Sequence, residues 1–386
     1  MEKEKGCAPG LIIAVITVCC LFILSPFANA KDEDVSDWTS FMKDQSHSSV
    51  SDESLATPLS LKWKFDTKGP VYASPVVSEG LVFIGSFDKN FYAIDLETGK
   101  KRWQFATKGE ISGSANVENG VVYFGSKDGF LYALSAKNGK LIWKYKAGGK
   151  VTSSPVVGRK YVYIGSKNVL LTAVDKKRGR KKWRKTLVRD RFSGGYSNPF
   201  FQDGLLVVAS KLGEVFAFNE KGRKQWAFSV PSAVYSSPVL RDNTLYLGAY
   251  DRFVYSLNVM DNEIQPNWRK DLGAPVYGSP FVQNGVFVGT TKGILYSLDE
   301  EDGSELWKLN LNKPLFSTLA VTSDNLGFLG CEDGNIYAVD LDEGMVVWSY
   351  STGGGIHSSP AIVTGNLLFG SKDGSVYALH PQGEEN

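Results

Sequence analysis

The fold of this chain is indicated by a repeated sequence motif that is clearest in residues 151–183, VTSSPVVGRKYVYIGSKNVLLTAVDKKRGRKKW. The motif consists of a Ser-Ser-Pro segment, a Gly-Ser-Lys turn, an apolar run and a tryptophan. It recurs along the chain, so that eight of the nine tryptophans are spaced 39 to 43 residues apart. They are Trp63, Trp103, Trp143, Trp183, Trp226, Trp268, Trp307 and Trp348. A period near forty residues with several short strands per unit is typical of β-propeller blades.

The unit at residues 111–147 shows what one repeat contains. Four runs are rich in β-branched and aromatic residues, at 111–117, 121–125, 130–135 and 141–146. Turns that contain glycine separate these runs, at 118–120, 127–129 and 137–139, and glycine suits a backbone that needs a positive φ. We therefore predict four antiparallel strands per repeat, and an all-β, eight-bladed propeller as the fold.

The two ends of the repeat array complement each other. The first fragment is a single tryptophan-bearing run at residues 61–67, whereas the last unit, residues 356–380, stops after its third strand. We predict that residues 61–67 supply the outer strand of the last blade. That exchange would close the ring and remove an open sheet edge.

The recurrent tryptophans have a structural interpretation. An indole that buries 150–250 Å² gains on the order of 4–6 kcal/mol of gross transfer free energy. Small residues such as Ala93 with Gly99, and Ala133 with Gly139, would let such a ring lie flat between blades. We assign the eight rings to packing between blades, and the alternative is that they stack on a ligand.

The amino-terminal residues predict export. Residues 1–30 read as a signal peptide, with Lys3 and Lys5, an apolar run from Leu11 to Leu24, and the small-residue site at 28–30. The alternative is a retained anchor, but fourteen apolar residues are few against the roughly twenty that span a bilayer. We expect residues 31–58 to be a polar tether whose Trp38 segment docks on the propeller, residues 59–380 to be the propeller, and 381–386 to be a tail. The mature protein would be periplasmic or extracellular, without stable membrane insertion, and monomeric on its own.

The overall charge identifies no partner. The formal net charge is +2, from 43 basic and 41 acidic residues, and removal of residues 1–30 leaves it unchanged. Three of the four cysteines lie in the signal segment, so only Cys331 remains and no internal disulfide is possible. A nucleic-acid partner is not expected, because basic residues are not interleaved with aromatic stacking platforms.

Few residues suggest catalysis or metal binding. The three histidines, His47, His357 and His380, have no ligand spacing, so we expect no metal site. The Asp-Gly turns at Asp128, Asp333 and Asp373 supply single carboxylates, which are too few for calcium and are explained by turn geometry. Cys331 has no histidine near it in the repeat, and it occupies the position of a small structural residue that is serine in other blades: Ser86, Ser126, Ser166 and Ser371.

One segment is strongly basic. Residues 176–191 contain ten lysines and arginines and one acidic residue. Two interpretations stay open, an anionic partner or charges that protect an exposed outer strand from edge-to-edge pairing. Seven turns between second and third strands also carry a basic residue on one rim: Lys89, Lys127, Lys167, Lys211, Arg252, Lys292 and Lys372.

A family resemblance lies in the repeated phrases Ser153-Ser154-Pro155, Tyr132-Ala133-Leu134 and Asn138-Gly139-Lys140, together with Gly165-Ser166 and Trp143. They resemble the repeat of quinoprotein-like propellers, which are named for pyrroloquinoline quinone (PQQ) dehydrogenases, and the resemblance covers residues 61–380. The repeat occurs in both dehydrogenases and non-catalytic proteins. Among the latter, the chain is most similar to BamB-like outer-membrane protein assembly factors, although the lipid-attachment cysteine typical of them has no counterpart here.

The resemblance implies two functions. A quinone-dependent dehydrogenase of this family would have an adjacent cysteine pair near the cofactor, calcium ligands, an aspartate base and long pocket loops. The mature chain lacks the cysteine pair and the long loops, so we expect neither PQQ nor calcium and favour a non-catalytic scaffold. Its partner would be a protein, such as a β-barrel assembly subunit at the outer membrane. By the resemblance, the loop that carries Leu187, Arg189 and Arg191 would contact it. A PQQ-dependent alcohol or sugar dehydrogenase is the alternative.

Overall fold

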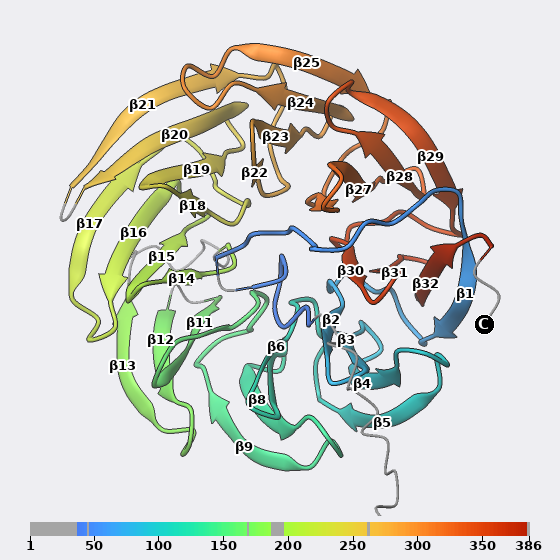
Figure 1. The fold of residues 1–386 in the computed structure, drawn as a ribbon. Coiled ribbons are helices and arrows are strands. Elements are labelled where there is room, and N and C mark those ends of the chain that lie inside the picture. Colours follow the sequence, from blue (N-terminus) through green and yellow to red (C-terminus); the bar gives the residue numbers. More distant parts are fainter. Residues whose placement is uncertain (1–36, 45, 168–169, 187–196, 261–262, 384–386) are drawn as a thin grey trace, which may run out of the picture. The chain divides into compact units, whose positions relative to one another are not determined.

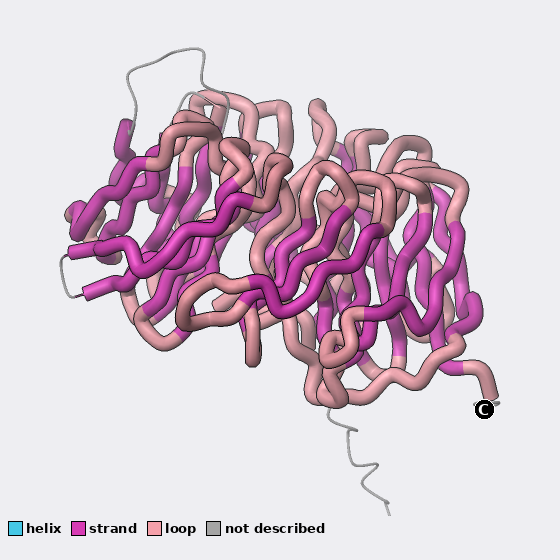
Figure 2. Tube along the Cα trace, turned by 90° about the horizontal axis from the view of Figure 1, so that it is seen from above, coloured by secondary structure: helices cyan, strands magenta, loops and turns pink. Residues whose placement is uncertain are grey.

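Eight four-stranded antiparallel sheets lie around a central channel (Figure 1). The computed structural model describes residues 37–44, 46–167, 170–186, 197–260 and 263–383. These ranges contain strands and loops but no helix (Figure 2), and therefore no helix long and apolar enough to cross a bilayer. The prediction of an all-β, eight-bladed propeller is confirmed.

The first four blades follow one another along the chain. Blade 1 contains β2 (Val76–Ser78), β3 (Leu81–Gly85), β4 (Asn90–Asp95) and β5 (Lys101–Ala106). Blade 2 contains β6 (Asn116–Glu118), β7 (Val121–Gly125), β8 (Phe130–Ser135) and β9 (Leu141–Lys146). Blade 3 contains β10 (Val156–Val157), β11 (Tyr161–Ser166), β12 (Leu170–Asp175) and β13 (Lys181–Thr186). Blade 4 contains β14 (Phe200–Gln202), β15 (Leu205–Ala209), β16 (Glu214–Asn219) and β17 (Lys224–Ser229).

The next three blades repeat this order, and the eighth uses both ends of the array. Blade 5 contains β18 (Val239–Arg241), β19 (Thr244–Gly248), β20 (Phe253–Met260) and β21 (Glu263–Asp271). Blade 6 contains β22 (Phe281–Val282), β23 (Val286–Gly289), β24 (Ile294–Leu298) and β25 (Glu305–Asn310). Blade 7 contains β26 (Ala320–Val321), β27 (Leu326–Gly330), β28 (Asn335–Asp340) and β29 (Met345–Ser351). Blade 8 contains β30 (Ala361–Val363), β31 (Asn366–Gly370), β32 (Ser375–Pro381) and β1 (Leu59–Asp66).

Blade 2 matches its predicted strands except at the channel. Its second, third and fourth strands have the predicted bounds, but the first is only β6, instead of the whole of residues 111–117. The amides of residues 111–115 serve neighbouring blades: Ile111 N–H donates to the Ser86 carbonyl (3.2 Å), and Ser114 N–H donates to Ser154 Oγ (2.9 Å). Because these donors are used between blades, they cannot extend the strand within its sheet.

The ring closes as predicted, by β1 pairing with β32. The register runs from Leu59 opposite Pro381 to Asp66 opposite Ser375, and Thr67 N–H then donates to the Gly374 carbonyl (2.7 Å). In Figure 1, β1 lies along the outer side of β32 at the end of the blade array. The outermost strand of blade 8 therefore comes from the other end of the array.

The repeated tryptophans contact the next blade. Trp63 Nε1 donates to the Leu96 carbonyl (2.7 Å), and its ring lies on Gly99, where a Cβ would come within 2.7 Å of the indole. Only glycine leaves room for that contact at a φ of 66°. Trp103, Trp143, Trp183, Trp268 and Trp307 donate to the next blade in the same way, at 2.8–3.0 Å. The indoles therefore have a packing role that requires no ligand.

Residues 37–58, which we call the strap, lie within the segment that we predicted to be a polar tether docked through Trp38. The strap crosses the ring at one end of the channel (Figure 1), on the side where the first and second strands of each blade are joined. Trp38 exchanges two backbone hydrogen bonds with Val77 in blade 1 (2.8 and 2.9 Å), and further along the strap Val50 bridges Val321 in blade 7. Trp38 and Met42 are each only 1% exposed, so their burial offsets the cost of ordering a polar segment.

Candidate functional site

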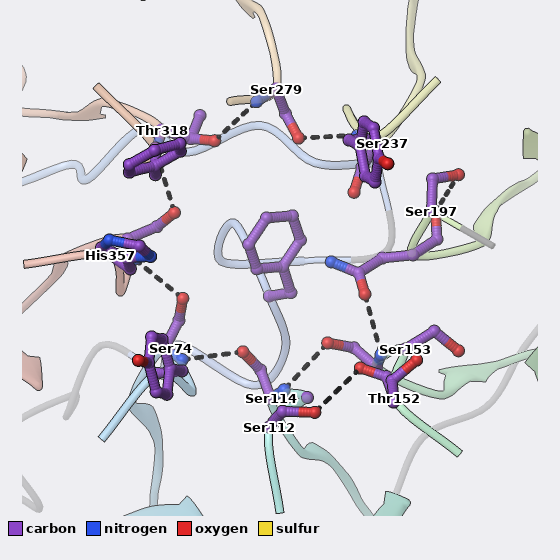
Figure 3. A pocket seen from close by; sticks show the side chains of 18 of the residues that line it. Ser74, Ser112, Ser114, Thr152, Ser153, Ser197, Ser237, Ser279, Thr318 and His357 are labelled. Atoms are coloured by element: carbon purple, nitrogen blue, oxygen red, sulfur yellow. Dashed lines mark hydrogen bonds between the residues drawn. The ribbon is translucent and has the colours of Figure 1, made fainter. Parts of the chain in front are cut away.

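A ring of polar residues surrounds the channel, one from each blade (Figure 3). They stand just before the first strand of each blade: Ser74, Ser114, Ser154, Asn198, Ser237, Ser279, Thr318 and Ser359. In seven of the eight steps, as far as the chain is described, the backbone amide of one residue donates to the side-chain oxygen of its counterpart in the next blade, at 2.8–3.2 Å. These six hydroxyls and the Asn198 amide oxygen therefore link the blades to one another.

The hydroxyl ring is a second closure of the propeller. Ser359 N–H donates to Ser74 Oγ (2.9 Å), which joins blade 8 to blade 1 across 285 positions of sequence. Proline follows six of the eight ring residues. Because proline restrains the residue before it to an extended conformation, it favours the backbone geometry that this ring repeats.

Above the hydroxyl ring the channel opens into a cavity of about 340 Å³. In seven blades the residue two positions before the ring residue lines it, and in blades 1, 5, 6, 7 and 8 this residue is an aromatic ring or a histidine: Tyr72, Tyr235, Tyr277, Phe316 and His357. In blades 2 and 3 the same position holds Ser112 and Thr152. We call these residues, with Phe87 and Lys211, the channel mouth.

The aromatic side chains of the mouth contact one another in an arc. Tyr235 stacks on Tyr277, with ring centroids 4.8 Å apart and an interplanar angle of 14°, and Tyr277 meets Phe316 edge to face at 5.2 Å. Phe316 continues to His357 at 4.3 Å. Tyr277 is 39% exposed although it belongs to this cluster. The mouth therefore offers aromatic faces to solvent from a rigid support, as binding sites commonly do.

Lys211 in the mouth and Lys372 near His357 have different surroundings. Lys211 Nζ lies 4.7 Å from the centroid of the Tyr235 ring, and among the described residues no carboxylate forms an ion pair with it. Burial and the neighbouring charge of Lys167 lower the pKa of Lys211. By contrast, Lys372 pairs with Glu332 (2.5 Å), whose other oxygen contacts His357 Nε2. Burial raises the pKa of the Glu332 carboxyl, but the hydrogen bonds from Lys372 and His357 bring the pKa below its usual value.

The floor of the mouth comes from the strap. Phe41 lines the cavity from below, and it meets His47 edge to face, with centroids 5.6 Å apart. His47 Nδ1 lies 3.1 Å from the Pro238 carbonyl oxygen, and burial lowers the pKa of His47 to about 4. The strap thus closes one end of the channel with a neutral, fully packed cluster.

The residues that the sequence suggested for chemistry do not meet. His47 belongs to the strap and lies against Pro238, His357 lies at the mouth, and His380 lies in β32 opposite Ser60. Cys331 is buried, its Sγ donates to the Lys313 carbonyl (3.4 Å), and burial raises the pKa of its thiol to about 12. Leu187, Arg189 and Arg191, the predicted partner contacts, lie outside the described residues.

The aspartates of the Asp-Gly turns accept hydrogen bonds that hold the turns in place. Asp373 accepts the Tyr377 hydroxyl (2.6 Å) and the amides of Ser375 and Gly353, the last in the connection between blades 7 and 8. Asp88, Asp128, Asp251 and Asp333 hold a tyrosine hydroxyl in the same manner, at 2.5–2.7 Å. Each carboxylate is therefore engaged by its own blade.

The residues of the channel do not fit PQQ with calcium as the resemblance describes that site. Within the described ranges, no three His, Cys, Asp or Glu side chains are grouped so that they could hold a metal ion. Cys331 is the one cysteine in these ranges, so an adjacent pair is lacking. Ser153, which lines the cavity, donates its hydroxyl to the Gly165 carbonyl (3.2 Å), which is again a structural use.

Sequence reasoning did not identify the channel mouth. The signal was present in the chain as an aromatic residue or histidine two positions before the ring residue: Tyr72, Tyr235, Tyr277, Phe316 and His357. It becomes visible only when the eight repeats are aligned on their Ser-Pro position. The tryptophan period alone does not single out that position, because the tryptophans lie on the outer strands.

Two family profiles together match the whole propeller. The sequence profile of the family described as "Beta-alanine-activating enzyme, beta-propeller" matches residues 46–284, more than half of the chain. The profile described as "Outer membrane protein assembly factor BamB" matches residues 265–385. The outer membrane protein assembly factor BamB of Yersinia pestis is 27% identical over 143 residues, which are 34% of this chain and 36% of that protein. The match thus spans about a third of that relative's length.

Solved structures share the fold. The crystal structure of BamB from Moraxella catarrhalis has a TM-score of 0.72 and 15% identity, over 84% of this chain and 100% of that one. The quinohemoprotein alcohol dehydrogenase of Comamonas testosteroni has a TM-score of 0.78 and 17% identity, over 91% of this chain and 81% of that one. At such identities the likeness is one of fold, and it includes both kinds of protein that the repeat suggested. With the tryptophan repeat, the eight closed blades and the matching profile all on one chain, the protein belongs to the β-propeller family described for the beta-alanine-activating enzyme, among the PQQ-like propellers.

Proposed function

We propose that this protein is a non-catalytic scaffold that binds a protein partner at the channel mouth. The observation that carries the proposal is the contrast between the mouth and the rest of the channel. Hydroxyls that could do chemistry join the blades and turn carboxylates hold tyrosines of their own blade, whereas Tyr277 and Lys211 remain available. Tyrosine rings are among the side chains that contribute most to the binding energy of protein interfaces.

The setting that we propose for this scaffold is outside the cytoplasm. The predicted signal peptide at residues 1–30 supports export. The partial likeness to outer membrane protein assembly factors supports a partner in envelope protein assembly. The loop with Leu187, Arg189 and Arg191 stays a proposed additional contact.

The test is crosslinking of the full chain in its own cells, with a photoreactive side chain at position 277. We expect one reproducible envelope protein to be captured, and the capture to fall at least tenfold with Tyr235→Ala and Lys211→Ala. The matched control is Leu306→Ala, since Leu306 is 54% exposed on β25, far from the mouth. Equal capture by all variants would refute the mouth as the interface.

A second measurement separates the scaffold from the dehydrogenase alternative. The purified chain would be mixed with PQQ and calcium, and oxidation of alcohols and sugars would be followed with an electron-accepting dye. We expect no turnover above the rate without protein. Turnover that requires PQQ would overturn the proposal.

A further inference from the structure

The charges of the propeller are separated across the ring, although its net charge is small. Residues 137–185, in blades 2 and 3, contain sixteen lysines and arginines and one acidic residue, Asp175. Residues 299–343, in blades 6 and 7, contain eleven acidic and two basic residues. Figure 1 shows β9 and β13 on one side of the ring and β25 and β29 across the channel from them. We call the outer strands of blades 2 and 3, with the turns that precede them, the basic edge.

The cations of the basic edge are exposed and mostly unpaired. In both β9 and β13 the outward-facing residues are exposed, among them Lys144, Lys181 and Lys182. Within the described ranges, one lysine of residues 137–185 forms an ion pair, Lys176 with Glu118. The Asp175 carboxylate is occupied by the backbone amides of Lys177 and Arg178. Most of this charge is therefore free to attract an external anion.

Protection of the strand edge does not account for so much charge. An outer strand can be protected from edge-to-edge pairing by one or two charged residues. β25 has two, Glu305 and Lys308, and β29 has none, with the sequence MVVWSYS and three exposed apolar side chains. β13 has four, all of them basic, in the sequence KKWRKT. Other outer strands have fewer charges, as in β17, or charges of both signs, as in β21, so the charge of a single sign on β13 has another cause.

Apolar side chains lie among these cations. Leu141 and Ile142, at the start of β9, are 45% and 50% exposed, and they stand between Lys140 and Lys144. The edge is the convex outside of the ring, and its charge is spread over two blades instead of being gathered around a pocket. Long, mobile cations with a few exposed apolar residues suit a fluid layer of phosphate headgroups. A folded acidic protein would need carboxylates placed to match a curved and diffuse surface.

We propose that the basic edge binds the anionic headgroups of a lipid bilayer. The acidic edge of blades 6 and 7 strengthens the orientation, because an anionic surface attracts one side of the ring and repels the other. The propeller then stands on its edge with its channel axis along the bilayer plane. The channel mouth stays open to a partner in this orientation, so lipid binding and partner binding use separate surfaces.

The test is sedimentation of the full chain with vesicles of phosphatidylcholine that contain 30% phosphatidylglycerol, compared with phosphatidylcholine alone. The variant carries Lys140→Gln, Lys144→Gln, Lys181→Gln and Lys182→Gln. The matched control carries Lys68→Gln, Lys100→Gln, Lys292→Gln and Lys313→Gln, which are exposed lysines outside blades 2 and 3. Both variants lose four charges and keep the same amino-terminal segment, so a difference between them reports the edge.

We expect the wild type and the control to bind anionic vesicles, and the basic-edge variant to bind them at least tenfold more weakly. Binding of the wild type should fall steeply between 0.05 and 0.5 M salt. Equal binding by the two variants, or equal binding of the wild type to both kinds of vesicle, would overturn the proposal. So would charge-dependent binding to poly-glutamate without binding to vesicles, since that result assigns the edge to an acidic protein.

Discussion

The two ends of the central channel are built in opposite ways. At the strap end, the Glu53 carboxylate accepts the amides of Thr364 and Gly365 (2.9 and 2.7 Å), and Trp38 is 1% exposed. At the mouth, Tyr277 is 39% exposed and Lys211 has no counter-ion among the described residues. One end is completed by the chain itself, and the other is left incomplete.

The difference separates stability from recognition. A buried, satisfied cluster contributes to the free energy of unfolding, whereas exposed aromatic rings and an unpaired cation contribute little until something covers them. Substitutions at the strap should therefore unfold the protein, and substitutions at the mouth should leave it folded. The predictions below test this contrast, after the ring closure on which both ends depend.

The largest effect should follow deletion of residues 59–67. This deletion removes β1, exposes the edge of β32 and takes away the indole of Trp63. We expect the melting temperature to fall by more than about 10 °C, or the protein to aggregate. Thermal unfolding followed by circular dichroism measures it. A truncated chain that melts like the full chain would show that β1 does not close the ring.

At the strap end, Trp38→Ala should lower the free energy of unfolding by about 3–5 kcal/mol, because it leaves a large cavity among Val77, Leu55 and Leu59. Denaturant unfolding measures the loss. The companion variant is Tyr277→Ala at the mouth, which should cost about 1 kcal/mol or less because Tyr277 is partly exposed. If both variants lose the same stability, the two ends do not differ as the contacts indicate.

The strap should also make stability depend on pH. The pKa of His47 is about 4 in the folded protein and 6.5 when unfolded, so the unfolded state binds more protons between these values. The contribution is fully present above pH 6.5 and is lost as the pH falls toward 4. At pH 5 the loss should be about 2 kcal/mol.

The measurement is denaturant unfolding at pH 7 and pH 5. Protonation of His357 should also lower stability as the pH falls, because burial lowers the pKa of His357 despite the raising effect of Glu332. His357→Gln therefore serves as the reference, and His47→Gln should remove the larger part of the pH dependence. The interpretation fails if His47→Gln leaves the difference between the two pH values unchanged.

Much of the fold was readable in the sequence because it is local and repeated. Turns such as 137–139 and the tryptophan period predict the blades, and the unmatched fragments at residues 61–67 and 356–380 predict the closure. The strap was not predicted in this form, because its sequence is polar and only a few side chains, such as Trp38 and Met42, are large and apolar. Its order comes from contacts with blades distant in sequence, such as that of Val50 with Val321.

The candidate site was harder to predict from the sequence, because it also depends on residues that are distant along the chain. The sequence emphasised the loop around Arg189 and the basic run at 176–185, which are conspicuous by composition. The mouth is instead assembled from single residues in separate blades, such as Tyr72 and Phe316, which lie 244 positions apart and meet at one cavity. No local pattern contains such a site, because only the ring geometry brings its parts together.

Lys211→Met should have the smallest effect on the free energy of unfolding, and it should raise that free energy where the other substitutions lower it. Methionine keeps an apolar stem over the Tyr235 ring but removes a half-buried charge that has no ion-pair partner among the described residues. We expect the free energy of unfolding to stay the same or to rise by about 0.5 kcal/mol, discounted for the exposed part of the side chain. Lys372→Met is the matched comparison, since it breaks the pair with Glu332 and should lower stability. A loss for Lys211→Met as large as that for Lys372→Met would mean that Lys211 stabilises the folded protein, and the mouth would then resemble the strap end.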